Sequence, residues 1–321
     1  MRASRRAFIG WSLSAAALAG APLWAAAGPV QVVATTGMIA DAARQVGSDL
    51  VEVKALMGSG VDPHAYRQTR SDIVAATRAD LVLWHGLYLE AQMEEFLLKL
   101  AKRGHVVAVG EAVPEQDLIG HEDYAGKFDP HVWMVPELWA HVVRRVQQAL
   151  SETAPAHAET FAANAAAHLA DIERLGAYAT ERLASVPAPS RVLLTAHDAF
   201  GYFGRAYGFE VVGIQGISTE SEAGLNRIRT LTDMLVERDI SAVFVETSVS
   251  DRNIRALIEG AGAQGHEVRV GGELFSDAMG EPGSYEGTYI GMIDHNATTI
   301  ATALGGQAPA RGMNGKLAAG S

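Results

Sequence analysis

Short β-branched runs alternate with longer segments of helical periodicity along most of the chain. This alternation is typical of parallel sheets flanked by helices, because a crossover between parallel strands usually contains a helix. The strand-like runs cover residues 30–35, 51–56, 80–84 and 105–109 in the first half, and 191–195, 211–214, 242–246 and 266–270 in the second. The pattern therefore predicts an α/β protein with two parallel-sheet lobes.

One long helix is expected between the two sets of strands. From Pro155 to Val186 the chain has no further proline and only one glycine, Gly176, while apolar residues recur at near-helical intervals. Pro155 suits the first turn of a helix and Pro187 closes it, so we assign residues 151–187 to this linking helix. A single rigid helix should restrict closure of the lobes on a ligand more than flexible strands would.

The length of the chain favours two domains. At 321 residues it is about twice as long as a usual domain. We expect an N-terminal α/β lobe over residues 28–150 and a C-terminal α/β lobe over 188–307. The closing segment 308–321, rich in Gly and Ala, is expected to be a flexible tail.

The first 27 residues have the composition of an export signal. Arginines and no acid open the segment, a moderately apolar stretch runs from Phe8 to Leu23, and small residues end it at Ala27. We expect cleavage near Ala27 and a periplasmic location. Residues 4–9 resemble the twin-arginine export motif, and the alternative is a Sec signal whose charged start holds two arginines. A membrane anchor is less favoured, since the apolar run is short and rich in Ala, Gly and Ser.

The absence of cysteine narrows the chemistry. It excludes a structural disulfide, a thiolate metal ligand and a lipid-modified cysteine at the start of the mature chain, so a freely diffusing periplasmic monomer is the simplest inference. The formal net charge is −11, and removal of residues 1–27 would leave 23 basic against 37 acidic residues. An acidic surface argues against nucleic acid or anionic lipid as a partner.

A candidate metal site is formed by residues that lie far apart in the sequence. Three follow predicted strands, at the edge where the loops of parallel α/β sheets converge on a ligand. The tripeptide Asp-Pro-His occurs twice, at 62–64 and 129–131, and a proline before histidine fixes the local backbone. Without thiolate, a first-row metal ion must be held by imidazole, carboxylate, carbonyl or water. The candidate ligands are His64, His131, His197 and Asp277.

Three segments, Thr195–Phe203, Gly216–Ala223 and Gly272–Gly280, resemble the solute-binding proteins of zinc and manganese ABC importers. The likeness is greatest to the TroA-like branch and spans essentially the whole mature chain. It implies two α/β lobes joined by a long backbone helix, with one metal ion bound between them in the cleft. It also implies delivery of the ion to a membrane permease driven by a cytoplasmic ATPase. Position by position, the family's ligands fall on the same four residues, His64, His131, His197 and Asp277.

The sequence does not decide whether the bound metal is zinc or manganese, because it departs from the patterns of both groups of family members. The third ligand is glutamate in many manganese-directed members, whereas here it is His197. Zinc-dedicated members often carry a long His-rich and acid-rich loop before the second ligand, whereas residues 115–129 here offer only His121 with a few acids. Three imidazoles and one carboxylate would fill a tetrahedral shell around zinc, and use of both Asp277 oxygens would give five donors, which manganese tolerates better. The intrinsic affinity order predicts that zinc binds more tightly than manganese, although the cell's metal supply can still decide the cargo.

Two other classes of function stay open at this stage. A secreted metallohydrolase would need an open coordination position and a general base such as Glu246 or Glu220, but no His-Glu-x-x-His motif is present. An adhesin or a structural periplasmic protein would bind no stoichiometric metal. A filled His and Asp shell favours binding over catalysis.

Other polar residues receive weaker assignments. His85 follows a predicted strand and could be a neighbour of the site, while Asp62 and Asp129 are expected to form turns. The imidazoles need acceptors at their other ring nitrogens, and the acids in nearby loops are Asp198, Glu220, Glu222 and Glu246. The remaining histidines, expected to be surface or structural groups, are His105, His121, His141, His157, His168, His266 and His295.

Overall fold

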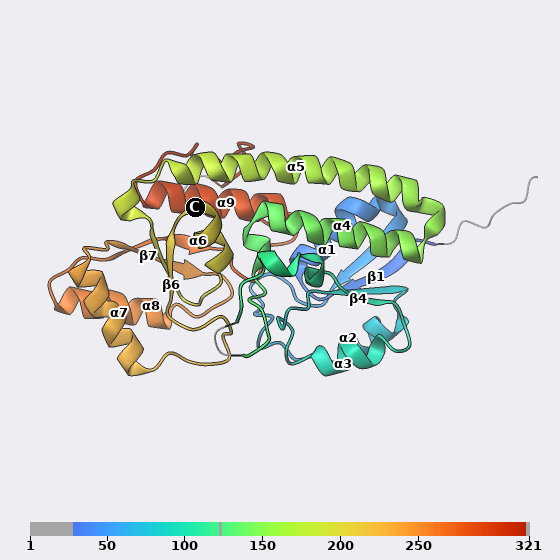
Figure 1. Cartoon of the computed structure of the whole chain (residues 1–321), viewed down its shortest axis with the longest axis horizontal. Coiled ribbons are helices and arrows are strands. Elements are labelled where there is room, and N and C mark those ends of the chain that lie inside the picture. The colour runs from blue at the N-terminus through green and yellow to red at the C-terminus, as the bar shows by residue number, and fades with distance from the viewer. Residues whose placement is uncertain (1–27, 122–123, 319–321) are drawn as a thin grey trace, which may run out of the picture.

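Two α/β lobes lie side by side beneath one long helix (Figure 1). This computed structural model describes residues 28–121 and 124–318, and the expected export signal lies outside that range. All strand pairs within the sheets are parallel, which confirms the predicted fold class. None of the described helices is long and apolar enough to cross a lipid bilayer.

The N-terminal lobe is a four-stranded sheet in the order β2-β1-β3-β4. Its strands are β1 (Val30–Ala34), β2 (Val51–Ala55), β3 (Leu81–Trp84) and β4 (Val106–Ala108). Helices α1 (Gly37–Gly47) and α4 (Pro136–Thr153) cover one face, and α2 (Arg70–Arg78) and α3 (Glu94–Leu100) cover the other. Strand β3 is buried along its whole length because both faces are covered, which is why it reads as a continuous apolar run.

The C-terminal lobe contains two pairs of hydrogen-bonded strands that pack against each other. The strands are β5 (Val192–Thr195) with β6 (Glu210–Gly213), and β7 (Ala242–Glu246) with β8 (Arg269–Leu274). Helices α6 (Gly201–Tyr207) and α9 (Tyr289–Ala303) cover one face, and α7 (Leu225–Glu237) and α8 (Arg252–Ala263) cover the other. Short 3-10 turns in the chain cover Ser48–Leu50, Gly110–Ala112, Glu115–Asp117, Val132–Met134, Pro155–His157 and Ala188–Ser190.

The last strand differs from its predicted position. The sequence predicted residues 266–270, but β8 runs from Arg269 to Leu274 and includes the pair Gly271 and Gly272, which read as a break. Close packing requires both glycines, Gly272 against α9 and Gly271 mainly against Phe244 of the neighbouring strand β7. A Cβ on Gly272 would lie 2.4 Å from Cγ2 of Thr299, and one on Gly271 would lie 2.9 Å from the ring of Phe244. The prediction of residues 266–270 is therefore wrong because a tertiary contact, not strand propensity, places these glycines.

The predicted linking helix is α5 (Ala158–Ala184), which is shorter than the predicted residues 151–187. Residues 151–153 end α4, and the 3-10 turn Pro155–His157 separates that helix from α5. The 27 residues of α5 correspond to about 40 Å of helix, enough to pass over both lobes, and Figure 1 shows it lying across them. It packs on α4 and α1 in one lobe and on α9 in the other, and one hydrophobic core cluster contains residues of all these helices. The lobes are thus joined by a shared apolar layer as well as by the chain.

The chain after α9 returns to the body of the protein. The backbone N–H of Met313 donates to the buried carboxylate of Asp294 at 2.9 Å, and Leu317 is 2% exposed. The described part of the segment 308–321 therefore packs on α9, although its composition predicted a flexible tail. The segment is ordered because the carboxylate of Asp294 in α9 holds its backbone, a contact that the composition of the segment does not encode.

Candidate metal centre

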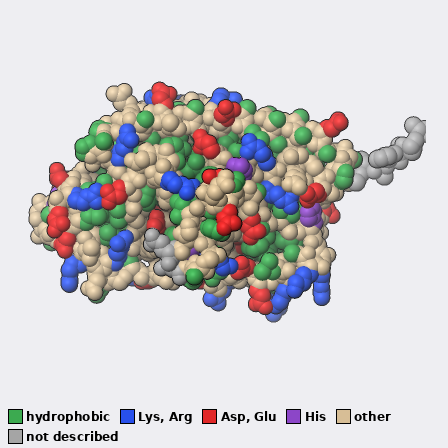
Figure 2. Space-filling view, in the orientation of Figure 1, with side chains coloured by type: hydrophobic (Ala, Val, Ile, Leu, Met, Phe, Trp, Pro, Cys, Tyr) green, Lys and Arg blue, Asp and Glu red, His purple; other side chains and the backbone are tan. Residues whose placement is uncertain are grey.

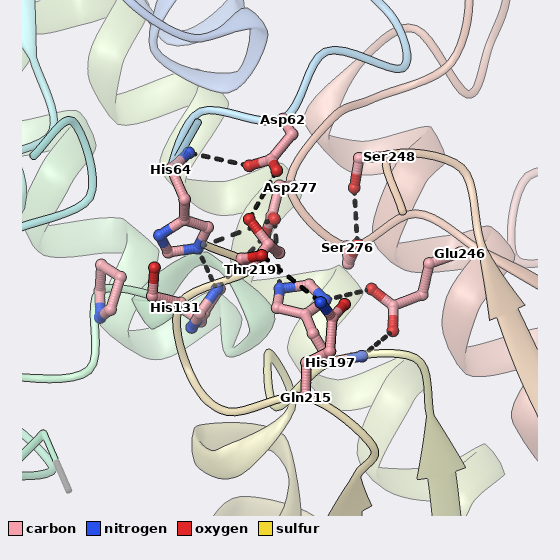
Figure 3. Close-up of polar contacts among 12 residues, drawn as sticks. Asp62, His64, His131, His197, Gln215, Thr219, Glu246, Ser248, Ser276 and Asp277 are labelled. Carbon is pink, nitrogen blue, oxygen red and sulfur yellow. Dashed lines mark hydrogen bonds and ion pairs between the residues drawn. The ribbon is translucent and has the colours of Figure 1, made fainter. Parts of the chain in front are cut away.

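The four candidate ligands meet between the lobes, each on a different loop. His64 lies between β2 and α2, His131 directly before the 3-10 turn that leads into α4, His197 after β5 and Asp277 after β8. Their exposed fractions are 3%, 0%, 0% and 2%. Figure 3 shows the three imidazoles directed toward the Asp277 carboxylate. The structure thus brings together all four residues that the sequence predicted as ligands.

The distances between donor atoms fit one shared ion. Nε2 of His64 lies 3.3 Å from Nε2 of His131, and the Asp277 oxygens lie 3.3 Å from Nε2 of His131, 3.2 Å from Nε2 of His197 and 3.8 Å from Nε2 of His64. One ligand atom from each residue lies within 4.8 Å of the other three. A tetrahedral zinc shell with bonds of about 2.0 to 2.1 Å separates neighbouring donors by about 3.3 to 3.4 Å. The arrangement is therefore close to the size of a closed four-donor shell.

Three buried atoms at the centre lack a hydrogen bond of good geometry. Nε2 of His197 and both carboxylate oxygens of Asp277 have no hydrogen-bond partner within the described part of the chain. Buried polar atoms are nearly always hydrogen-bonded, because an unpaired one costs about 1 to 3 kcal/mol. A cation at this point would satisfy all three atoms. Within residues 28–121 and 124–318 this is the single cluster of His, Asp and Glu suited to a metal ion.

Carboxylates orient two of the three imidazoles. Nδ1 of His131 lies 2.7 Å from Oδ1 of Asp129, and Nδ1 of His197 lies 2.5 Å from Oε2 of Glu246. The same two carboxylates also accept from the backbone N–H groups of His131 and His197, at 2.9 Å each. Each ring is thereby held with Nε2 toward the centre, an arrangement typical of metal-binding histidines.

These partners were only partly foreseen. Glu246 was one of four acids named as possible partners, whereas Asp129 was expected to act only as a turn former. Asp129 does both, since its Oδ1 reaches the backbone and the ring of His131. In both Asp-Pro-His tripeptides the aspartate lies two residues before the histidine, close enough to contact it. That spacing does not tell which of the two aspartates also contacts the histidine ring. Asp62 makes the same backbone contact to His64 at 2.8 Å, and its other oxygen turns to Thr219.

Charges within the cluster set the protonation of the metal-free site. Burial alone would lower the pKa of His131 and His197, but the neighbouring carboxylates outweigh burial and raise the pKa of His131 to about 9 and that of His197 well above its usual value. Burial would raise the pKa of Asp277, but His197 and His131 hold it well below its usual range. Burial lowers the pKa of His64 to about 3. Protons on two imidazoles thus offset the charge of Asp277, and an arriving cation must displace them.

His85 is a neighbour of the site and is not part of the four-residue cluster. Its Nε2 lies 2.7 Å from the carbonyl oxygen of Pro130, and its ring packs edge-on against Trp133 at 5.0 Å between centroids. Burial lowers the pKa of His85 to about 3, so the ring is neutral. It supports the turn that carries His131. The histidines that lie outside the cluster are His105, His121, His141, His157, His168, His266 and His295.

One face of the molecule carries charges of both signs. Figure 2 shows acidic and basic side chains interspersed on the face viewed. The acidic excess of the sequence therefore appears on this face without a continuous acidic patch.

Comparison with known proteins gives a consistent set of relatives. A family model described as the periplasmic zinc-uptake complex component A matches residues 32–303. The manganese-binding lipoprotein MntA of Bacillus subtilis (strain 168) is 48% identical over 276 residues, which cover 86% of this chain and 90% of that protein. The iron-binding protein YfeA of Yersinia pestis is 34% identical over 276 residues, covering 86% of each chain.

The zinc-binding protein TroA of Treponema pallidum is similar in both sequence and structure. It is 45% identical over 280 residues, which cover 87% of this chain and 90% of that protein. Its solved structure matches with a TM-score of 0.83 over 86% of this chain and 99% of that chain. These three relatives are named for three different metals, manganese, iron and zinc.

Proposed function

The chain belongs to the family of the periplasmic zinc-uptake complex component A, and from this premise we propose that it captures one divalent cation through His64, His131, His197 and Asp277. Members of this family and their relatives are substrate-binding proteins of metal ABC importers, so the chain is a binding protein and not an enzyme. The observation that carries the ligand assignment is the mutual approach of four buried donor groups from four separate loops.

Zinc is the ion that this donor set should hold most tightly. Three neutral imidazoles and a carboxylate suit zinc, and the donor separations of 3.2 to 3.8 Å approach those of its tetrahedral shell. Both oxygens of Asp277 face the ring nitrogens, so a fifth donor is also within reach, and manganese would use it. We therefore propose zinc or manganese as cargo, with zinc bound more tightly in vitro.

The metallohydrolase alternative has no support. Glu246, one of the two general bases considered, uses both carboxylate oxygens to accept hydrogen bonds from His197. Glu220, the other, is exposed and accepts a hydrogen bond from Gln92. Glu246 thus has no oxygen left to activate a water molecule, and Glu220 is not part of the cluster of candidate ligands.

We propose that the protein acts as an exported monomer that releases its ion to an inner-membrane permease. The family description and the relatives' names support an exported location, and cleavage near Ala27 is our proposal for the start of the mature chain. The acidic composition supports a partner other than nucleic acid.

Metal analysis of protein purified without chelator, followed by competitive titration with zinc and manganese, tests this function. We expect one tightly held ion per chain and displacement of manganese by zinc. His197→Ala should weaken zinc binding by orders of magnitude without unfolding the protein, whereas His141→Ala, outside the cluster, should bind as the wild type does. Wild-type protein without stoichiometric metal, or an unchanged affinity for His197→Ala, would contradict the proposal.

A further inference from the structure

Contacts across the cleft fall into a buried set and a more exposed set. On the buried side, Nε1 of Trp133 donates to the carbonyl of Ser276 at 2.8 Å, and the Tyr202 hydroxyl donates to the carbonyl of Asp129 at 2.7 Å. These bonds tie the loops of His131 and Asp277 into the joined cores. The other set includes a bond from Thr219 to Asp62, and its participants are only partly buried.

The Thr219 to Asp62 bond joins the loop of one candidate ligand to the opposite lobe. Oγ1 of Thr219 donates to Oδ2 of Asp62 at 2.5 Å, while Oδ1 of the same carboxylate accepts from the backbone N–H of His64 at 2.8 Å. One carboxylate therefore fixes the backbone of His64 and the position of the C-terminal lobe at once. Figure 3 shows Asp62 between the two groups.

The loop that carries Thr219 is itself bonded to the loop of His197. The backbone N–H of Gln215 donates to the carbonyl of Ala196 at 3.0 Å, and that of Asp198 donates to the carbonyl of Gly216 at 3.2 Å. These two bonds bracket His197 in the sequence. A continuous path of hydrogen bonds and short loops thus runs from His197 to His64 without passing through the metal position.

His64 is the outermost of the four ligands. Its side chain is 4% exposed, whereas those of His131, His197 and Asp277 are fully buried. Among the described residues, no carboxylate contacts its ring nitrogen Nδ1 in the way that Asp129 and Glu246 contact His131 and His197. The position of His64 therefore depends on its backbone, which Asp62 holds.

On the basis of the proposed metal-binding function, we propose that Asp62 and Thr219 form a latch that holds His64 over the ion and sets the rate of its release. Both are positioning residues that do not touch the ion. Breaking the latch frees the loop of His64 to move away from the C-terminal lobe, while the three inner ligands stay tied by the buried bonds. The latch acts on the dissociation rate, because the bond between Thr219 and Asp62 must break before the loop of His64 can move away from the ion.

Stopped-flow release of zinc into excess colorimetric chelator, at several chelator concentrations, tests the latch. Thr219→Val keeps the shape of the side chain and removes the donor, and we expect release about tenfold faster than wild type, as expected for loss of a hydrogen bond to a charged group. Thr219→Ser should restore the wild-type rate. Addition of Thr219→Val to Asp62→Ala should produce no further increase, since both changes break the same bond.

Thr77→Val is the matched control, because the hydroxyl of Thr77 donates to the carbonyl of Ile73 within α2, away from the cleft. It should leave the release rate unchanged. Equal release rates for Thr219→Val and wild type, both loaded with one ion, overturn the latch and leave the proposed function intact. Faster release that Thr219→Ser does not restore also overturns it. Wild-type protein that holds no zinc overturns both proposals.

Discussion

Replacement of Glu246 by glutamine perturbs the two hydrogen bonds that orient the candidate ligand His197. The wild-type carboxylate accepts from Nδ1 of His197 at 2.5 Å and from the backbone N–H of His197 at 2.9 Å, and both side chains are fully buried. Glutamine has one carbonyl oxygen, so it can satisfy one of these donors and must turn its NH2 group toward the other. Loss of such a carboxylate partner typically weakens metal binding about 10- to 100-fold, or about 1.4 to 2.8 kcal/mol. Because both side chains are buried from water, we expect a loss of affinity in the upper half of this range.

The change should also alter the number of protons released on binding. Burial would lower the pKa of His197, but Glu246 and Asp277 outweigh it, so the metal-free imidazole carries a proton at neutral pH that the ion must displace. Without the charge of Glu246 that proton is held less tightly. Glu246→Gln should therefore release up to about one proton fewer than the wild type. The loss of affinity should be largest at alkaline pH and should shrink as the solution is acidified.

Isothermal titration with zinc in buffers of different ionisation enthalpy measures affinity and proton release together. Glu222→Gln is the matched control, because Glu222 is exposed and makes no contact with the site in the described structure. It should behave as the wild type does. The reasoning would be refuted by Glu246→Gln that binds zinc with wild-type affinity and releases the same number of protons.

Three further predictions concern the rest of the molecule. Burial raises the pKa of Glu90 from 4.5 to about 7, so the folded protein holds this proton at pH values where the unfolded chain has lost it. Folding stability relative to Glu90→Gln should fall by about 3 kcal/mol as the pH rises from about 4.5 to about 7 and then stay constant, as measured by urea unfolding of the metal-free protein. Saturation with zinc at 1,000 times its dissociation constant should stabilise the fold by about 4 kcal/mol, a rise of roughly 8 to 16 °C in calorimetry, and no rise would count against specific binding. Gly272→Ala should destabilise the C-terminal lobe by about 1 to 3 kcal/mol because its Cβ would overlap Thr299, and a second change, Thr299→Ala, should recover most of that loss.

The positions of the candidate ligands could be predicted because the direction of the strands places most of them at one edge of the sheets. Once the strands were judged parallel, residues just beyond β5 and β8 had to lie at the same edge, and His197 and Asp277 were found there. The repeated Asp-Pro-His marked His64 and His131 because a proline restricts the backbone before the ring. Alternating apolar runs predicted seven of the eight strands to within a residue or two at their ends.

Other features depend on contacts that no local pattern encodes. Glu246 could be named only as one of four candidates, because its contact with His197 joins residues 49 positions apart. Gly271 and Gly272 read as a strand break, yet they lie inside β8 because α9 approaches it closely. The segment after α9 is held by Asp294, and its own composition gives no sign of that anchor. Tertiary packing decides each of these cases.

The most direct test of a single four-ligand cation site is anomalous diffraction at the zinc absorption edge from crystals of zinc-loaded protein. We predict one strong peak per chain, with Nε2 of His64, His131 and His197 and an oxygen of Asp277 each about 2.0 to 2.2 Å away. A peak at another place in the chain, or a shell in which water replaces one of these four donors, would contradict the assignment.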